Sequence, residues 1–183
     1  MIGKTSLVRS YATAEFPGPY TPTASDTYSV NVLVATKPIT FSISDTGGKE
    51  EYDQLRIIAY PNTDIFLCCF SVDSPDSFEH VRSKWFPELS SHCPTAPILL
   101  VGTKMDLAAD EQTVVRLKKE GHAGPVTREQ ALAMVQDIGA LSYVPCSSVT
   151  RQGVKEVFDA AIRALSAPSK PKNGPKDEKC CLQ

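Results

Sequence analysis

Two continuous apolar runs, at residues 65–70 and 98–101, place the strongest constraint on how this chain folds. A strand with one wet face alternates apolar and polar residues, so an unbroken apolar run indicates a strand that is covered on both faces. Phe78, Val81 and Trp85 lie between the two runs at helical spacing. Strands that alternate with helices predict an α/β fold, with a mostly parallel sheet and helices on both faces.

The remaining pattern fits the same fold class. Apolar residues alternate with polar ones at 28–34 and at 39–43, and a turn between them predicts an antiparallel hairpin. Ligands of a parallel sheet bind beyond the carboxyl ends of its strands, so we expect the functional site there. The spacing of apolar residues predicts helices at 3–14, at 128–138 and from about 153 onward, and a last strand at 141–145.

The composition limits the classes of partner. The 183 residues are 42% hydrophobic and 22% charged, which suits one domain with a substantial core. A net charge of −2 argues against nucleic acid as a partner, because phosphate backbones favour a basic face.

The six cysteines lack metal-ligand spacing and fit reduced cytosolic thiols. We expect a domain over 1–167 and a disordered tail over 168–183, which is rich in proline and lysine.

The tripeptide Gly3-Lys4-Thr5 matches the end of the phosphate-binding loop G-x-x-x-x-G-K-[ST]. In that loop the lysine reaches the β- and γ-phosphates and the hydroxyl binds Mg²⁺. The backbone N–H groups of the helix start, here continuing through Ser6, face the anion. Alone, the tripeptide is equally an ordinary helix start.

The sequence Asp45-Thr46-Gly47-Gly48 ends the second strand of the hairpin. A carboxylate at a strand end can hold Mg²⁺ through water. The N–H of Gly48 can approach a γ-phosphate closely, because glycine has no side chain. Alone, this sequence is also an ordinary turn, but together with the phosphate-loop tripeptide it predicts one site for phosphate and magnesium.

Two further loops carry candidate base-binding residues. Guanine presents two donors on its N1/N2 edge and a carboxylate accepts both, so Asp106 is the predicted base-selecting residue. It follows Thr103 and Lys104 at the end of a buried strand, and the aliphatic stem of Lys104 can cover the base face. After the last strand, Cys146-Ser147-Ser148 is expected to offer backbone N–H groups to the guanine O6. A polar loop without a ligand would have a similar composition.

These motifs, in this order, resemble the small GTPases of the Ras superfamily, and specifically its Rho/Rac branch. The implied fold is the Ras-like P-loop NTPase fold, and the resemblance runs from Gly3 to Gln183. A charged segment near 108–125 resembles the short helical insert of the Rho branch. The stretches that carry the resemblance are 20–23, 45–56, 90–94, 100–107, 146–148 and 180–183.

The resemblance implies roles for further residues. Thr23 would sense the γ-phosphate together with Mg²⁺, Phe16 would pack against the guanine, and Tyr20 would close over the phosphates. The implied magnesium ligands are Thr5, Thr23 and, through water, Asp45. Loops near 16–26 and 45–60 would be ordered by GTP and loosened by GDP.

The implied function is a GTP/GDP switch, nominally a GTP hydrolase, in signal transduction to the actin cytoskeleton and cell polarity. Its implied partners are exchange factors (GEF), GTPase-activating proteins (GAP), GDI-type extraction proteins and effectors such as kinases. A relative that is locked with GTP, or poor in nucleotide, and acts only by binding partners stays open as an alternative. Another phosphate-loop enzyme, such as a nucleotide kinase, fits Asp106 and Thr23 less well.

The sequence departs from the family pattern in four places. The strand and half-loop that would precede Gly3 are not in this sequence, so we expect the strands at 39–45 and 64–70 to lose their ladder partners. Lys49 stands where the family has the glutamine that orients the attacking water; lysine has no acceptor, so slow hydrolysis is expected. Gly47 replaces an alanine, and Ala24-Ser25 replaces a larger apolar pair, which alters the expected set of effectors.

The last four residues, Cys180-Cys181-Leu182-Gln183, have C-a-a-X form. This motif predicts prenylation of Cys180, and the terminal glutamine favours a farnesyl group. One lipid chain gives only marginal, reversible membrane binding. We therefore expect the protein at the cytoplasmic face of plasma or internal membranes, with a cytosolic pool.

Overall fold

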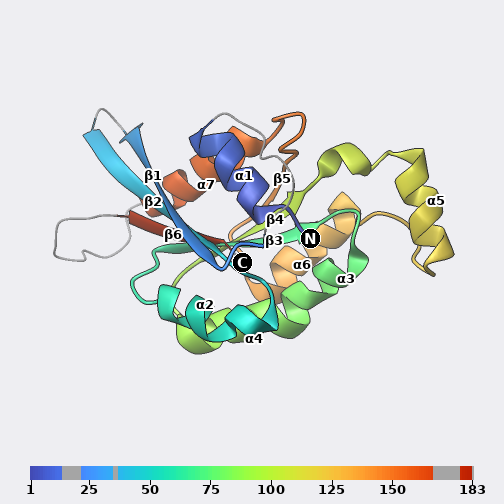
Figure 1. Cartoon of the computed structure of the whole chain (residues 1–183), viewed down its shortest axis with the longest axis horizontal. Coiled ribbons are helices and arrows are strands. Elements are labelled where there is room, and N and C mark those ends of the chain that lie inside the picture. The colour runs from blue at the N-terminus through green and yellow to red at the C-terminus, as the bar shows by residue number, and fades with distance from the viewer. Residues whose placement is uncertain (14–21, 35–36, 167–177, 183) are drawn as a thin grey trace.

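The computed structural model describes residues 1–13, 22–34, 37–166 and 178–182, and it contains a six-stranded sheet in the order β1-β2-β6-β3-β4-β5 (Figure 1). β1 runs antiparallel to β2, and each of the other neighbouring pairs is parallel. The predicted α/β class and mostly parallel sheet are confirmed. The strands are β1 Ser25–Val34, β2 Lys37–Thr46, β3 Ile65–Ser71, β4 Ile98–Thr103, β5 Tyr143–Pro145 and β6 Glu178–Leu182.

Helices cover both faces of the sheet, as the sequence predicts (Figure 1). α1 (Lys4–Ala12) and α7 (Val154–Ser166) pack on one face. The other face is covered by α2 (Asp53–Ala59), α3 (Pro75–His80), α4 (Phe86–His92) and α6 (Arg128–Ile138). α5 (Glu111–Lys119) stands at one end of the molecule, away from the sheet (Figure 1).

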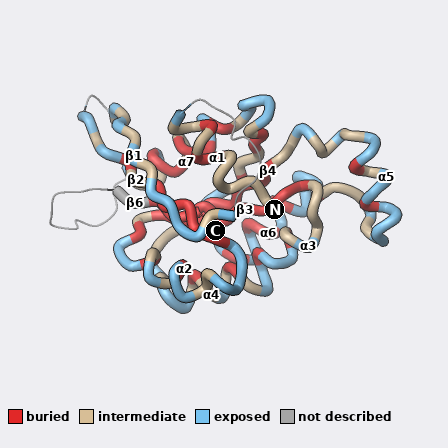
Figure 2. The backbone as a smooth tube through the Cα atoms, viewed as in Figure 1, coloured by how far each residue is buried: buried red, intermediate tan, exposed pale blue. Residues whose placement is uncertain are grey.

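β3 shows why an unbroken apolar run belongs at the centre of such a sheet. Every residue of this strand is buried, and successive side chains point to opposite faces. Ile65 and Leu67 enter the core beneath α1 and α7, whereas Phe66 and Phe70 enter the core beneath α3, α4 and α6. Figure 2 shows the buried residues running through the middle of the molecule between the two helical layers.

The predicted element boundaries hold with small differences. α6 begins and ends where the sequence predicts, and a capping box between Thr127 and Gln130 defines its start. α1 ends at Ala12 rather than at residue 14, and β5 covers 143–145 rather than 141–145. The helical spacing around Phe78 belongs to one helical segment, in which a π-helical stretch, Val81–Trp85, joins α3 to α4.

The prediction of a disordered tail is wrong for Glu178–Leu182, which forms the central strand β6. β6 pairs with β2 from Phe41↔Glu178 to Asp45↔Leu182, and with β3 from Ile65↔Cys180 to Leu67↔Leu182. The prediction that β2 and β3 lack ladder partners is therefore wrong as well. Cys180 and Leu182 enter one core and Cys181 enters the other, so the chain is buried on both faces at residues 180–182.

Within the described ranges, no helix combines the length and apolar character that are needed to cross a bilayer.

Candidate functional site

The residues that lead into α1 lie against the carboxyl end of β4. The Thr103 hydroxyl is 2.5 Å from the carbonyl oxygen of Ile2 and 3.0 Å from that of Phe70. Gly3 caps α1 with a φ of 82°, a left-handed conformation that favours glycine. The structure thus brings the predicted phosphate-loop residues Gly3 to Ser6 to the predicted edge of the sheet.

Three polar side chains from separate parts of the chain meet beside the start of α1. The Thr5 hydroxyl donates to Oδ2 of Asp45, at 2.5 Å, and its oxygen lies 2.9 Å from the hydroxyl oxygen of Thr23. Thr5 comes from the first turn of α1, Asp45 from the end of β2, and Thr23 from the segment before β1. The structure therefore brings together all three predicted magnesium ligands.

Asp45 is fully buried, and its Oδ1 atom has no hydrogen-bond partner among the described residues. Burial raises the pKa of Asp45, while the hydrogen bond from Thr5 and the charge of Lys4 oppose this shift. A buried carboxylate oxygen without a partner is costly unless something else pairs with it. An oxygen-seeking cation such as Mg²⁺ fits this donor set of one carboxylate and two hydroxyls.

No cluster of three or more His, Cys, Asp or Glu side chains suited to a metal occurs in the part of the chain that the structure describes. A cation at Asp45 would therefore depend on the two threonine hydroxyls for its other protein ligands. This is the pattern expected of Mg²⁺, which keeps several waters and uses few protein ligands.

The ammonium group of Lys4 lies close to the Asp45-Thr46-Gly47-Gly48 turn. Desolvation by the surrounding protein lowers the pKa of Lys4, although the charge of Asp45 acts in the opposite direction. A Cβ atom placed on Gly48 would lie 3.1 Å from the Lys4 Nζ atom. A desolvated cation beside a helix start and a glycine N–H is well suited to bind an anionic phosphate.

Gly47 is the smaller residue that stands where the family carries alanine, and the structure gives a reason for it. A Cβ atom at this position would lie 2.5 Å from the Tyr52 ring and 2.7 Å from the carbonyl oxygen of Thr23. The Gly47 N–H donates to the carbonyl of Ala24, at 3.0 Å. The absent side chain lets the segment around Thr23 approach the end of β2.

The predicted base-binding residues lie on two neighbouring loops, after β4 and after β5. The Met105 N–H donates to the carbonyl of Cys146, at 3.1 Å, and this bond joins the loops. Lys104 has a left-handed backbone with a φ of 57°, and its Nζ atom lies 3.2 Å from a carboxylate oxygen of Asp73. Asp106 is exposed in a short 3₁₀ turn, where its carboxylate can meet a ligand from solvent.

The structure reduces the number of backbone amides that can donate to the guanine O6 atom. The Cys146 N–H donates to the carbonyl of Gly102, at 2.7 Å, and the Ser147 N–H donates to that of Gln152, at 2.8 Å. The prediction is therefore wrong for these two amides, because each already has a partner within the protein. It leaves the Ser148 N–H as the candidate donor.

Lys49 follows the glycine pair and is exposed, with its Nζ atom 3.2 Å from Oε1 of Glu51. Phe16 and Tyr20, the predicted contacts to guanine and phosphates, lie outside the described residues.

Arg56 is not among the predicted site residues, and its side chain is completely buried. Its guanidinium donates to both carboxylate oxygens of Glu88, at 2.8 and 2.9 Å, and to the carbonyl of Gly47, at 2.9 Å. It also lies 5.0 Å above the Trp85 ring. Arg56 therefore links the turn after β2 to α4. In the sequence, only Asp53, three positions before Arg56, indicates a partner for this side chain, because Glu88 lies far away.

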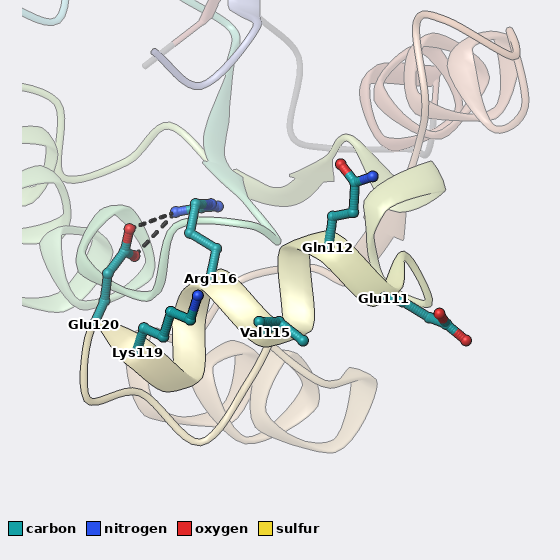
Figure 3. Close-up of a pocket in the computed structure, with 6 residues that line it drawn as sticks. All are labelled: Glu111, Gln112, Val115, Arg116, Lys119 and Glu120. Carbon is teal, nitrogen blue, oxygen red and sulfur yellow. Dashed lines mark hydrogen bonds and ion pairs between the residues drawn. The ribbon is translucent and has the colours of Figure 1, made fainter.

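The charged segment near 108–125 contains helix α5, so its predicted helical structure is confirmed. Asp110 caps the helix by accepting from the Thr113 N–H at 2.7 Å, and Leu117 of the helix is buried. Arg116 donates to the carbonyl of Asp73 at 2.9 Å and pairs with Glu120 (Figure 3). An open hollow of about 600 Å³ lies along this helix, away from the Asp45 cluster.

A mostly parallel sheet between two helical layers, with a Gly-Lys-Thr helix start against a strand-end carboxylate, defines a P-loop NTPase. The sequence model of the Ras family matches residues 1–167, and the chain belongs to this family. Its members are small GTPases that switch between GTP- and GDP-bound states, typically with Mg²⁺, and interact with regulators and effectors. The predicted resemblance to the Ras superfamily is confirmed.

Proposed function

We propose that this chain is a Rho-type switch that binds GTP and GDP with Mg²⁺ and signals to the actin cytoskeleton and cell polarity. The observation that carries the nucleotide-binding part is the convergence of Thr5, Thr23 and Asp45 beside the desolvated Lys4. Helix α5 supports the Rho assignment, because it falls where the Rho branch carries its helical insert.

In the proposed complex, Lys4 and the backbone N–H groups at the start of α1 bind the phosphates. Thr5, Thr23 and Asp45 would hold Mg²⁺. When bound, Mg²⁺ neutralises charge on the phosphate oxygens. Asp106 selects guanine, with Lys104 covering the base and the Ser148 N–H reaching its O6 atom.

Calorimetric titration of the purified chain with GDP, GTP and ATP tests this proposal, and Asp106→Asn sharpens the test. We expect the unaltered chain to prefer guanine nucleotides over ATP. Asp106→Asn should weaken GDP binding by about 10- to 100-fold, because a hydrogen bond to a charged group contributes about 1.5–3 kcal/mol. Asp137→Asn is the control, since Asp137 is exposed and pairs with Arg82 outside the site. Equal affinities for ATP and GDP would contradict the assignment.

We expect Lys49→Gln to raise the single-turnover rate of GTP hydrolysis by about 10- to 100-fold, because glutamine supplies the acceptor that positions the attacking water. Lys155→Gln is the matched control, since Lys155 lies on α7 and pairs with Asp159 at 2.6 Å. Radioactive phosphate release from preloaded protein measures both rates. An unaltered rate in Lys49→Gln would show that this position does not limit hydrolysis.

Lys49 also favours a second candidate function, a GTP-locked relative that acts only through partner binding. Chromatography of the nucleotide released from freshly purified protein separates the two functions. GDP indicates turnover, GTP alone indicates a locked switch, and neither nucleotide indicates a protein that acts by partner binding alone.

The proposed switch has GEF, GAP and GDI-type regulators, effectors such as kinases, and a prenyl group on Cys180 for membrane attachment. The C-a-a-X ending supports the lipid. The prenyl group would keep the protein at the cytoplasmic face of membranes, with a cytosolic pool.

A further inference from the structure

The segment with the proposed lipidation cysteine is the central strand of the sheet. Cys180 faces Ile43 of β2 and Ile65 of β3 in the ladder. Figure 1 shows β6 lying between these two strands, under the layer that contains α1 and α7. A thiol that must react with an external reagent is thus placed in the middle of the core.

Burial makes this thiol unreactive in two ways. Cys180, Cys181 and Leu182 are each 0% exposed, so no reagent reaches the sulfur of Cys180 while β6 stays in place. Burial also raises the pKa of the Cys180 thiol well above its ordinary value, which suppresses the nucleophilic thiolate.

β6 is held by its ladder bonds to β2 and β3 and by side-chain contacts at its end. The Leu182 carbonyl accepts from the Thr46 hydroxyl, and the sulfur of Cys181 lies 3.5 Å from the Thr63 hydroxyl and 3.6 Å from the Ala59 carbonyl oxygen. Only three residues of β6 pair with β3, from Cys180 to Leu182, and β6 is the last described segment of the chain. A strand of five residues that pairs with one neighbour over only three positions can open locally at lower free energy than the whole core.

We propose that Glu178–Leu182 exchanges between an inserted strand and a released segment, and that Cys180 is alkylated only when the segment is released. In prenylation, the Cys180 thiolate would attack C1 of an allylic isoprenoid diphosphate. The S–C bond forms, the C–O bond breaks, diphosphate leaves with the electron pair, and the thiol proton passes to solvent. The same five residues therefore serve either as the strand that completes the sheet or as the membrane attachment site. The lipid step rests on the proposed function, whereas the exchange itself does not.

Maleimide labelling of the folded full chain, followed by peptide mass spectrometry, tests the exchange without any nucleotide or lipid. A synthetic peptide of residues 174–183 gives the rate of the released thiol. In the unaltered protein we expect Cys93, which is partly exposed, to react first. Cys180 should react at least about 100-fold more slowly than the peptide, yet faster than the buried thiols of Cys68, Cys69 and Cys146.

Leu182→Asp places a charge in the core and should release the strand. We expect Cys180 to approach the peptide's rate in this variant, while Cys68, Cys69 and Cys146 stay protected. Leu141→Asp is the matched control, because Leu141 is exposed, and it should leave every rate unchanged.

Three results would overturn the proposal. Reaction of Cys180 at the peptide's rate in the unaltered chain would mean that the strand is not inserted in solution. Continued protection of Cys180 in Leu182→Asp would mean that another contact buries it. Simultaneous exposure of all the buried thiols in that variant would mean that β6 is an obligatory part of the fold and cannot be released alone.

Discussion

Arg56→Met is expected to lower the free energy of unfolding by about 3–5 kcal/mol, because it removes one partner of a buried ion pair and leaves the other without its countercharge. Arg56 has 0% side-chain exposure, and Glu88 has 15%. Burial lowers the pKa of Arg56, but its hydrogen bonds with Glu88 and Asp53 outweigh that effect and keep it charged. The variant also leaves the Gly47 carbonyl without its guanidinium donor.

Urea unfolding of three variants measures this effect. Arg82→Met is the matched control, since the Arg82–Asp137 pair is exposed and should contribute less than about 1 kcal/mol. Arg56→Met combined with Glu88→Gln should recover part of the loss, because the unpaired charge is gone and Tyr60 can still donate to the amide oxygen. A loss in Arg56→Met no larger than that in Arg82→Met would contradict the role of the buried pair.

Arg56 also connects stability to the candidate site. Its bond to the Gly47 carbonyl holds the turn that follows Asp45, and its bonds to Glu88 hold the same turn to α4. Arg56→Met should therefore loosen the glycine pair as well as the fold. The sequence could not reveal this link, because an arginine that follows an aspartate by three positions is usually an exposed helical pair.

The features that the sequence predicts well are those with local or periodic causes. Complete burial of β3 follows from its apolar run, and the hairpin β1–β2 follows from alternation around a turn. The meeting of Thr5 and Asp45 follows from a general property of parallel sheets, in which strand ends and helix starts share one edge. No distant side chain has to be identified for these predictions.

The strand β6 shows where this reasoning fails. A five-residue segment after a polar, proline-rich stretch has no strand signal strong enough to stand alone, and an isolated short strand is unstable. It becomes a strand here because β2 and β3 offer ladder partners on both sides and two cores accept Cys180, Cys181 and Leu182. These are tertiary contacts with residues more than a hundred positions away.

The loop after β5 shows a similar limit at the scale of single atoms. The sequence identifies Cys146 to Ser148 as a base-binding loop, but it does not say which amide is free. Pairing of the Cys146 and Ser147 N–H groups with Gly102 and Gln152 decides this, and such pairing depends on how the loop lies against β4 and folds back on itself. Backbone hydrogen-bond partners in irregular loops have no periodic signal.

Lys4→Met is expected to weaken GDP and GTP binding by at least about 100-fold while changing the stability of the fold only a little. The loss follows because each charge-assisted hydrogen bond to a phosphate contributes about 1.5–3 kcal/mol. Stability should not fall by more than about 1 kcal/mol, since methionine has a similar length and carries no charge to desolvate. Desolvation already lowers the pKa of Lys4 in the structure, which indicates that its charge is costly to bury.

Calorimetric titration and urea unfolding of the same samples separate the two effects. Lys155→Met is the control for the loss of a lysine charge, because Lys155 lies on α7 and pairs with Asp159 away from the site. It should change neither quantity measurably. If Lys4→Met bound GDP as tightly as the unaltered chain, the ammonium beside Asp45 would be a structural counterion rather than a phosphate ligand. If the variant lost stability together with affinity, Lys4 would be holding the end of β2 in place, and weaker nucleotide binding would be a consequence of that.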